Sequence, residues 1–189
     1  LNTKYSVNIE FDNFVKRFRD GKGIVVQTVV GRSGSLFLQS LFDSHPQVLM
    51  FPGILNFYCG FYTNKIKDRH TFSQDFTDYF IKLFDRLSPY NIFHHLGKNG
   101  DERVDIDLHR LFSLIEEFEP EKLDRRSLFL AFHYAVGKYL ELDLEKIKII
   151  YCHEHNYKMD WSDDIISDFP ACNVLCSIRD PVTNHSSIV

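Results

Sequence analysis

The chain has 189 residues, of which 44% are hydrophobic, so it is long enough for one domain with a substantial core and too short for two domains of ordinary size. Its formal net charge of −4 argues against a nucleic-acid partner held by a broadly basic surface, although a local basic pocket for a nucleotide is compatible with it. No segment approaches the roughly 18 continuous apolar residues of a membrane span, so we expect no membrane contact within this segment.

The cysteines give a second compositional clue. They form no Cys-x-x-Cys pair and have no zinc-like spacing, so we expect all four to be reduced and structural: Cys59, Cys152, Cys172 and Cys176. The first residues also lack the apolar core of a signal peptide. A cytoplasmic location is therefore expected, although the chain begins at Leu1 and a signal or anchor upstream of it would not be visible.

The first third of the chain alternates between helix and strand patterns. Apolar residues near helical spacing predict a helix over Ile9–Asp20, and the β-branched run Ile24–Val30 is typical of a buried strand. Helical spacing returns over Ser35–Phe42, and Val48–Phe51 predicts a second short strand. The aromatic segment Ile54–Tyr62 could line an acceptor pocket, but burial in the core is the simpler expectation.

The middle of the chain predicts an inserted helical layer. Three amphipathic patterns lie between the second strand and the third, over residues 71–87, 105–118 and 127–142. Beyond them, a third strand is expected over Ile147–Cys152, a short helix over Asp160–Phe169 and a fourth strand over Val174–Ile178. We therefore expect a single three-layer α/β domain with a short parallel sheet, Rossmann-like or P-loop-like in topology, and a helical insertion.

The turn between the first strand and the following helix has the parts of an anion site. It reads Gly31-Arg32-Ser33-Gly34-Ser35, and the first amide N–H groups of a helix have no partner within the helix. The glycines allow the backbone to approach a phosphate, Arg32 can donate two hydrogen bonds to it, and the serines add hydroxyls. The loop is not a Walker A motif, because the Gly-x-x-x-x-Gly-Lys-Ser/Thr pattern is absent.

Titratable residues follow the third strand. Ligands of open α/β sheets gather beyond the carboxyl ends of the strands, so His153, Glu154 and His155 are candidates for proton transfer. Strand alternation sends the two histidines to one side and Glu154 to the other. A His-x-His pair can also bind a metal, but no third ligand is identifiable in the sequence.

Two segments resemble the sulfotransferases that use 3'-phosphoadenosine 5'-phosphosulfate. Gly31-Arg32-Ser33-Gly34-Ser35, followed by Leu36-Phe37-Leu38 and His45-Pro46, resembles the 5'-phosphosulfate loop of that family in its arginine-bearing form. Val174-Leu175-Cys176-Ser177-Ile178 with Arg179-Asp180-Pro181, and with Ser187 eight positions after the arginine, resembles the strand and helix start that bind the nucleotide's 3'-phosphate.

The resemblance implies which co-substrate binds, which residues hold it, and how much of the family fold this chain covers. Arg32 and the loop amides would hold the 5'-phosphosulfate, Arg179 and Ser187 would hold the 3'-phosphate, and no metal is required. Family members often have a catalytic histidine at the end of the corresponding strand, which His155 matches, or His153 if the register differs. The glutamate that membrane-type relatives place after the second strand is absent from Phe51-Pro52-Gly53. The resemblance covers the core of the family fold and predicts a further C-terminal part that closes over the nucleotide.

The function expected is thus sulfuryl transfer to a hydroxyl or amine of a small-molecule or carbohydrate acceptor. Two alternatives from other classes remain open. A nucleotide-dependent phosphotransferase would need a P-loop lysine and a magnesium-binding acid, and neither is evident. A non-catalytic nucleotide-binding or scaffold domain would keep the fold without the chemistry. The sequence does not identify the acceptor or the oligomeric state.

Overall fold

The computed structural model describes residues 3–29, 33–51, 55–58, 75, 107–118, 123–154, 161–178 and 180. Its elements follow in the order α1 (Thr3–Phe18), β1 (Ile24–Val29), α2 (Ser35–Phe42), β2 (Val48–Met50), α4 (Leu108–Glu116), α5 (Arg125–Tyr139), β3 (Ile149–Glu154), α6 (Ser162–Asp168) and β4 (Asn173–Ser177).

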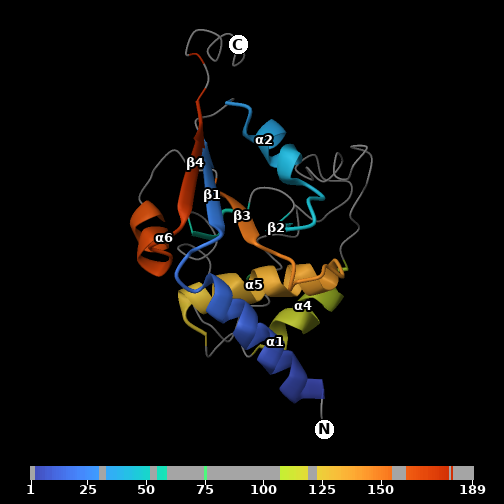
Figure 1. Ribbon diagram of the computed structural model, residues 1–189. Coiled ribbons are helices and arrows are strands. Elements are labelled where there is room, and N and C mark those ends of the chain that lie inside the picture. The colour runs from blue at the N-terminus through green and yellow to red at the C-terminus, as the bar shows by residue number, and fades with distance from the viewer. Residues whose placement is uncertain are drawn as a thin grey trace.

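The four described strands form one parallel sheet in the order β2-β3-β1-β4 (Figure 1). Strand β1 lies in the interior of the sheet, where Ile24 pairs with Ile150 of β3 and Val29 pairs with Ser177 of β4. Parallel neighbours need crossover connections that place helices on the sheet faces. The expected three-layer α/β fold with a parallel sheet is confirmed, and β1 pairs in parallel with β3.

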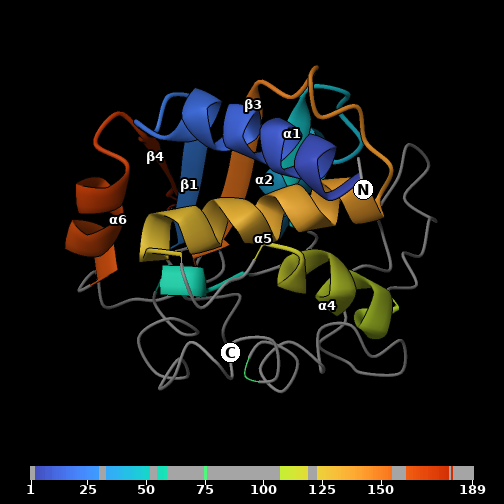
Figure 2. The same cartoon turned by 90° about the horizontal axis from the view of Figure 1, so that it is seen from below.

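The two faces of the sheet carry different clusters of side chains. On one face, Ile24, Val26 and Cys152 belong to the large core cluster, which includes residues of α1, α4 and α5. On the other face, Tyr151 packs against Phe42 of α2, with ring centroids 4.8 Å apart. Helices α1 and α5 lie side by side in both ribbon views (Figure 2).

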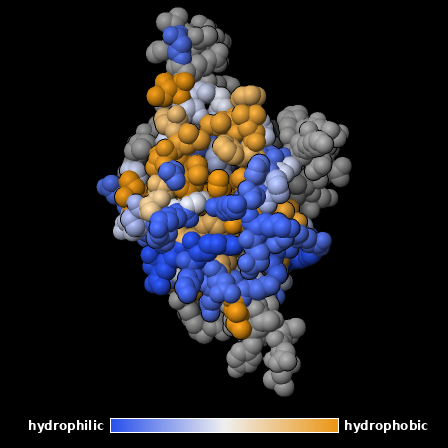
Figure 3. All heavy atoms as spheres, viewed as in Figure 1, coloured by the Kyte–Doolittle hydropathy of each residue, from blue (hydrophilic) through white to orange (hydrophobic). Residues whose placement is uncertain are grey.

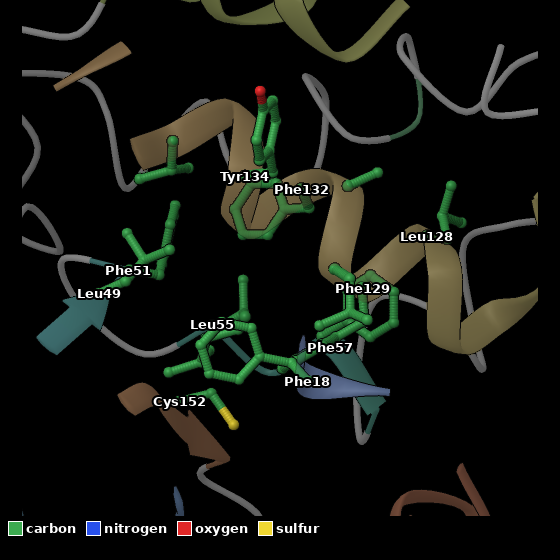
Figure 4. Packing of buried hydrophobic residues seen from close by; sticks show 14 of the residues in the cluster. Phe18, Leu49, Phe51, Leu55, Phe57, Leu128, Phe129, Phe132, Tyr134 and Cys152 are labelled. Atoms are coloured by element: carbon green, nitrogen blue, oxygen red, sulfur yellow. The ribbon is translucent and has the colours of Figure 1, made fainter. Parts of the chain in front are cut away.

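Helix α5 is buried more completely than the amphipathic helix that the sequence predicts. Every residue from Leu128 to Gly137 is buried. Aromatic rings from several elements surround the helix: Phe14 of α1 contacts Tyr134, and Phe57 contacts Phe129. Figure 4 shows how side chains of α5, of the strands and of the segment from 55 to 58 fill the space between helix and sheet. Because the helix is covered on several sides, the spacing of apolar residues in its sequence does not predict which of its side chains are buried.

The boundaries of several elements differ from the expected ones. Helix α1 begins at Thr3 rather than Ile9, and β3 continues to Glu154, so His153 and Glu154 lie inside the strand rather than after it. The expected burial of the aromatic segment is confirmed for Leu55, Phe57 and Tyr58, which are at most 1% exposed. The helix expected over residues 71–87 lies outside the described residues, apart from Asp75.

Strand β4 lies at the edge of the described sheet, and its side chains are more exposed than those of β1 and β3. Val174 is 49% exposed, whereas its register partner Val26 is fully buried. Cys176 of β4 is exposed as well, while Cys152 of β3 is buried; these two and Cys172 are free thiols, and Cys59 lies outside the described residues. Burial raises the pKa of the Cys152 thiol well above its ordinary value, as expected for a structural cysteine.

On the face shown in Figure 3, hydrophilic residues gather in the lower half and hydrophobic ones in the upper half. Exposed apolar side chains include Phe37 and Leu41 of α2 and Ile178 after β4. Among the described helices, none combines the length and the apolar character needed to cross a bilayer.

The buried His133 of α5 predicts a pH-dependent stability. Its Nδ1 lies 2.8 Å from the carbonyl oxygen of Phe129, and burial lowers its pKa to about 4. An unfolded histidine titrates near pH 6.5, so between these values the unfolded chain binds more protons than the folded one and stability falls as the pH falls. His133 should therefore remove about 2 kcal/mol from the free energy of unfolding between pH 7.5 and pH 5.

Urea denaturation of the wild type and of His133→Phe at both pH values measures this term. The phenylalanine keeps a ring of similar size without a titrating group, so the variant should lose less stability on acidification than the wild type. Equal losses in the two proteins would show that His133 does not contribute.

Candidate functional site

Buried polar side chains gather at the carboxyl ends of β1 and β3. Of the buried polar or charged residues that the structure describes, all except His133 belong to this group, which we call the polar layer: Gln27, Thr28, Gln39, His153 and Glu154. Burying a polar group costs free energy unless it is hydrogen-bonded, so a cluster of this kind needs internal partners or a ligand. Its position at the carboxyl edge of a parallel sheet is where ligands bind in open α/β folds.

Gln27 connects the start of α2 with the end of β4. Its Nε2 donates to the main-chain oxygen of Ser35, the first residue of α2, and to Oγ of Ser177, the last residue of β4, each at 3.2 Å. Ser35 and Ser177 are 142 residues apart in the sequence, and one side chain holds both. Oε1 of Gln27 is buried and has no hydrogen-bond partner among the described residues.

His153 and Glu154 point to opposite faces of the sheet, as strand alternation predicts. His153 lies on the face covered by α2, where its Nδ1 is 3.2 Å from Oε1 of Gln39. Glu154 lies on the face of the large core, where its Oε1 accepts a hydrogen bond from the main-chain N–H of Tyr58 at 3.2 Å. Neither side chain is more than 1% exposed, so both are parts of the interior in this structure.

Tyr58, whose N–H is bound by Glu154, is anchored at its other end by an ionic group. Its hydroxyl donates to Asp168 of α6 at 2.9 Å, and Asp168 pairs with Arg125 of α5 at 2.6 Å. Arg125 also pairs with Asp164 at 2.7 Å. Burial, followed by the Asp168 charge, raises the pKa of Tyr58 well above its ordinary value, so the phenol stays a hydrogen-bond donor. These contacts hold the segment from 55 to 58 against the end of β3.

The turn before α2 is described from Ser33 onward. Gly34 has φ of 85°, the left-handed region that glycine adopts without strain, and it precedes α2 with no side-chain cap on the helix. A Cβ at Gly34 would meet nothing within 4 Å, so the backbone conformation, and not crowding, requires the glycine. Oγ of Ser33 is buried without a hydrogen-bond partner among the described residues.

The structure therefore describes part of the site predicted from sequence. Ser33, Gly34 and Ser35 lie at the start of α2, and His153 and Glu154 lie at the end of β3. Five expected site residues lie outside the described residues: Gly31, Arg32, His155, Arg179 and Ser187.

Three residues of the polar layer were missed by the sequence analysis: Gln27, Thr28 and Gln39. Gln27 appears in the sequence only as a polar break in an apolar strand, and Gln39 only as a polar position in an apolar helix. A polar residue on the buried face of an apolar strand or helix was the signal that could have identified them, because burying a polar side chain costs free energy unless it has hydrogen-bond partners.

We also searched the described residues for a metal site and for cavities outside the polar layer. Within the described ranges, no group of three His, Cys, Asp or Glu side chains is arranged to hold a metal ion. A cavity of about 320 Å³ has lining residues in α1 and α5 rather than in the polar layer. There Glu10 accepts hydrogen bonds from Tyr134 and Lys138, each at 3.0 Å, and so ties α1 to α5.

Comparison of the chain with protein-family models, with curated proteins and with solved structures finds no match. Arguments about function therefore depend on the residues and on their arrangement.

The contact between Glu154 and Tyr58 predicts a graded loss of stability. Glu154→Ala leaves the buried N–H of Tyr58 without this acceptor, which should cost about 1–3 kcal/mol beyond the lost packing. Glu154→Gln keeps an acceptor oxygen and should cost less. Urea denaturation of the two variants beside the wild type tests this order, and an alanine variant as stable as the glutamine variant would contradict it.

Proposed function

We propose that the protein is a sulfotransferase that moves a sulfuryl group from 3'-phosphoadenosine 5'-phosphosulfate to a hydroxyl or amine of a small-molecule or carbohydrate acceptor. The observation that carries this proposal is the adjacency of β1 and β4. One of the two segments that resemble nucleotide-binding motifs follows β1, and the other consists of most of β4 and the residues after it. Gln27 bonds to the first residue of α2 and to the last residue of β4. A nucleotide with phosphates at both ends of its ribose needs two anion sites near each other.

The start of α2 has the features of an anion site. The N-cap residue Gly34 provides no side-chain cap, and a Cβ added to it would meet nothing within 4 Å. Free N–H groups and the helix dipole favour negative charge there. Arg32, two residues before Gly34 in the sequence, would add a charged donor to the 5'-phosphosulfate, and Arg179, two residues after the end of β4, would do the same for the 3'-phosphate.

The proposed reaction is a displacement at sulfur. The acceptor's oxygen or nitrogen forms a bond to sulfur while the bond between sulfur and the bridging oxygen of the 5'-phosphate breaks. The electron pair of the broken bond stays on the phosphate oxygen, and 3'-phosphoadenosine 5'-phosphate leaves. Arg32 and the amides of the loop would stabilise the charge that develops on that oxygen. The acceptor's proton passes to a base on the protein, and this chemistry needs no metal.

A histidine is a better candidate for the base than Glu154. His153 lies on the sheet face that α2 covers, the same side to which the proposed anion loop leads. Glu154 lies on the opposite face, where its Oε1 accepts a hydrogen bond from the main-chain N–H of Tyr58. His155, two positions beyond His153, remains a candidate on the ground of sequence alone.

The proposal predicts that 3'-phosphoadenosine 5'-phosphate binds more tightly than AMP, because Arg179 and Ser187 would contact the additional phosphate. A charge-assisted contact of this kind contributes about 1.5–3 kcal/mol, so Arg179→Ala should weaken binding of the bisphosphate roughly tenfold to a hundredfold. AMP should bind equally to both proteins. Isothermal titration calorimetry measures these affinities, and Arg110→Ala, an exposed arginine on α4, is the matched control. Equal affinity of the wild type for the two nucleotides would exclude the assignment.

Arg32 should be needed for both nucleotide binding and transfer. In Arg32→Ala, sulfuryl transfer measured with labelled co-substrate over a panel of hydroxyl and amine acceptors should fall by about 10²-fold or more, because a donor to the developing charge is lost. Arg32→Lys should keep part of the activity, since lysine keeps the charge but loses the planar pair of donors. Unchanged transfer in Arg32→Ala would remove the loop from the mechanism.

A further inference from the structure

Gln39 of α2 is placed to act on His153. It is 5% exposed, whereas the next two residues of the helix, Ser40 and Leu41, are exposed. Phe42, three positions after Gln39 and therefore on the same side of the helix, packs against Tyr151 of β3. Gln39 thus lies on the helix face that covers β3, inside the polar layer.

Two hydrogen-bond contacts of Gln39 favour one orientation of its amide. Its Nε2 donates to the carbonyl oxygen of Phe51 at 3.5 Å, and its Oε1 lies 3.2 Å from Nδ1 of His153. The reversed amide would place Oε1 against the carbonyl of Phe51, and two acceptors repel each other. An amide oxygen can only accept, so the contact is a hydrogen bond when Nδ1 of His153 carries the proton, which leaves the lone pair of the neutral ring on Nε2.

Further contacts of His153 hold it in place. Its main-chain oxygen accepts from the N–H groups of Leu55 and Asn56 at 3.0 and 3.3 Å. Gln27, which is bonded to Ser35 and Ser177, is its register partner on β1. The ring is only 1% exposed, so side chains around it, rather than bulk water, decide which nitrogen is protonated.

We propose that Gln39 is a positioning residue that holds the imidazole of His153 in the Nδ1–H tautomer, with Nε2 as the nitrogen that takes the acceptor's proton. The identity of that proton's donor rests on the proposed function, whereas the tautomer is a property of the protein alone. A neutral amide suits this role. It orients the ring without stabilising the imidazolium as a carboxylate would, and the neutral ring is the form that accepts a proton.

The first test is the ¹⁵N NMR spectrum of the histidine rings at pH 8, in the wild type and in four variants. His153→Gln assigns the signals, and Ser40→Ala is the control from the same helix. In the wild type, Nδ1 of His153 should show the shift of a protonated nitrogen and Nε2 that of a bare one. In Gln39→Met, which has a similar length but no acceptor oxygen, the two nitrogens should move toward an average of both tautomers. Gln39→Glu retains an oxygen opposite Nδ1 and should keep that nitrogen protonated.

An Nε2–H tautomer in the wild type, or the same tautomer in the wild type and in Gln39→Met, would overturn the proposal. Should Gln39→Met fail to fold, Gln39→Asn provides the comparison, because it keeps the amide but withdraws its oxygen from Nδ1 by one methylene. It should then show the mixture of tautomers expected for the methionine variant.

The second test separates positioning from binding. In Gln39→Met, kcat for sulfuryl transfer should fall about tenfold to a hundredfold while affinity for 3'-phosphoadenosine 5'-phosphate stays within twofold of the wild type. Ser40→Ala should change neither quantity. A loss of nucleotide affinity equal to the loss in kcat would show that Gln39 only supports the loop, and would overturn the positioning role. If the wild type transfers no sulfuryl group, the proposed function fails, and the NMR comparison still decides whether Gln39 sets the tautomer.

Discussion

The pairing of β1 with both of its neighbours is the constraint on which the rest of the structure depends. In a parallel sheet all carboxyl ends point the same way, so the ends of β1, β3 and β4 lie at one edge although they are far apart in the sequence. Within the described sheet, β1 is hydrogen-bonded to β3 on one side and to β4 on the other. Moving β1 by one residue would reverse the faces of all its side chains and would send Gln27 into the large core.

The polar layer at this edge is stable because its members are bound from several directions. Gln27 reaches α2 and β4, Gln39 reaches β3 and the chain after β2, and Glu154 holds the main chain at Tyr58. The ion pairs of Arg125 with Asp164 and Asp168 keep Tyr58 in place from outside. Such a layer contributes less to stability than apolar packing of the same volume. A polar layer inside the protein is therefore better suited to orienting polar groups at a site than to stabilising the fold.

Much of the fold could be predicted from local patterns because most elements bury one face. Helix α2 was predicted with both of its ends correct, and the expected strand Ile24–Val30 contains the described β1, Ile24–Val29. Helix α5 was misjudged as amphipathic because α1 and the aromatic segment cover the side that an amphipathic helix turns to water. The end of β3 was placed too early for a related reason: His153 and Glu154 look like loop residues by polarity, and only their partners Gln39 and Tyr58 allow a strand to continue through them.

By itself the sequence determined the fold class, the glycine turn before α2, and the opposite directions of His153 and Glu154, because each follows from a local period or from a conformation that only glycine adopts easily. The tertiary structure alone decided which segments meet. Gln27 and Gln39 are ordinary polar residues in the sequence, and their partners lie between 8 and 150 positions away. No local rule specifies such partners, because they are brought together by strand order and by the packing of α2 on the sheet.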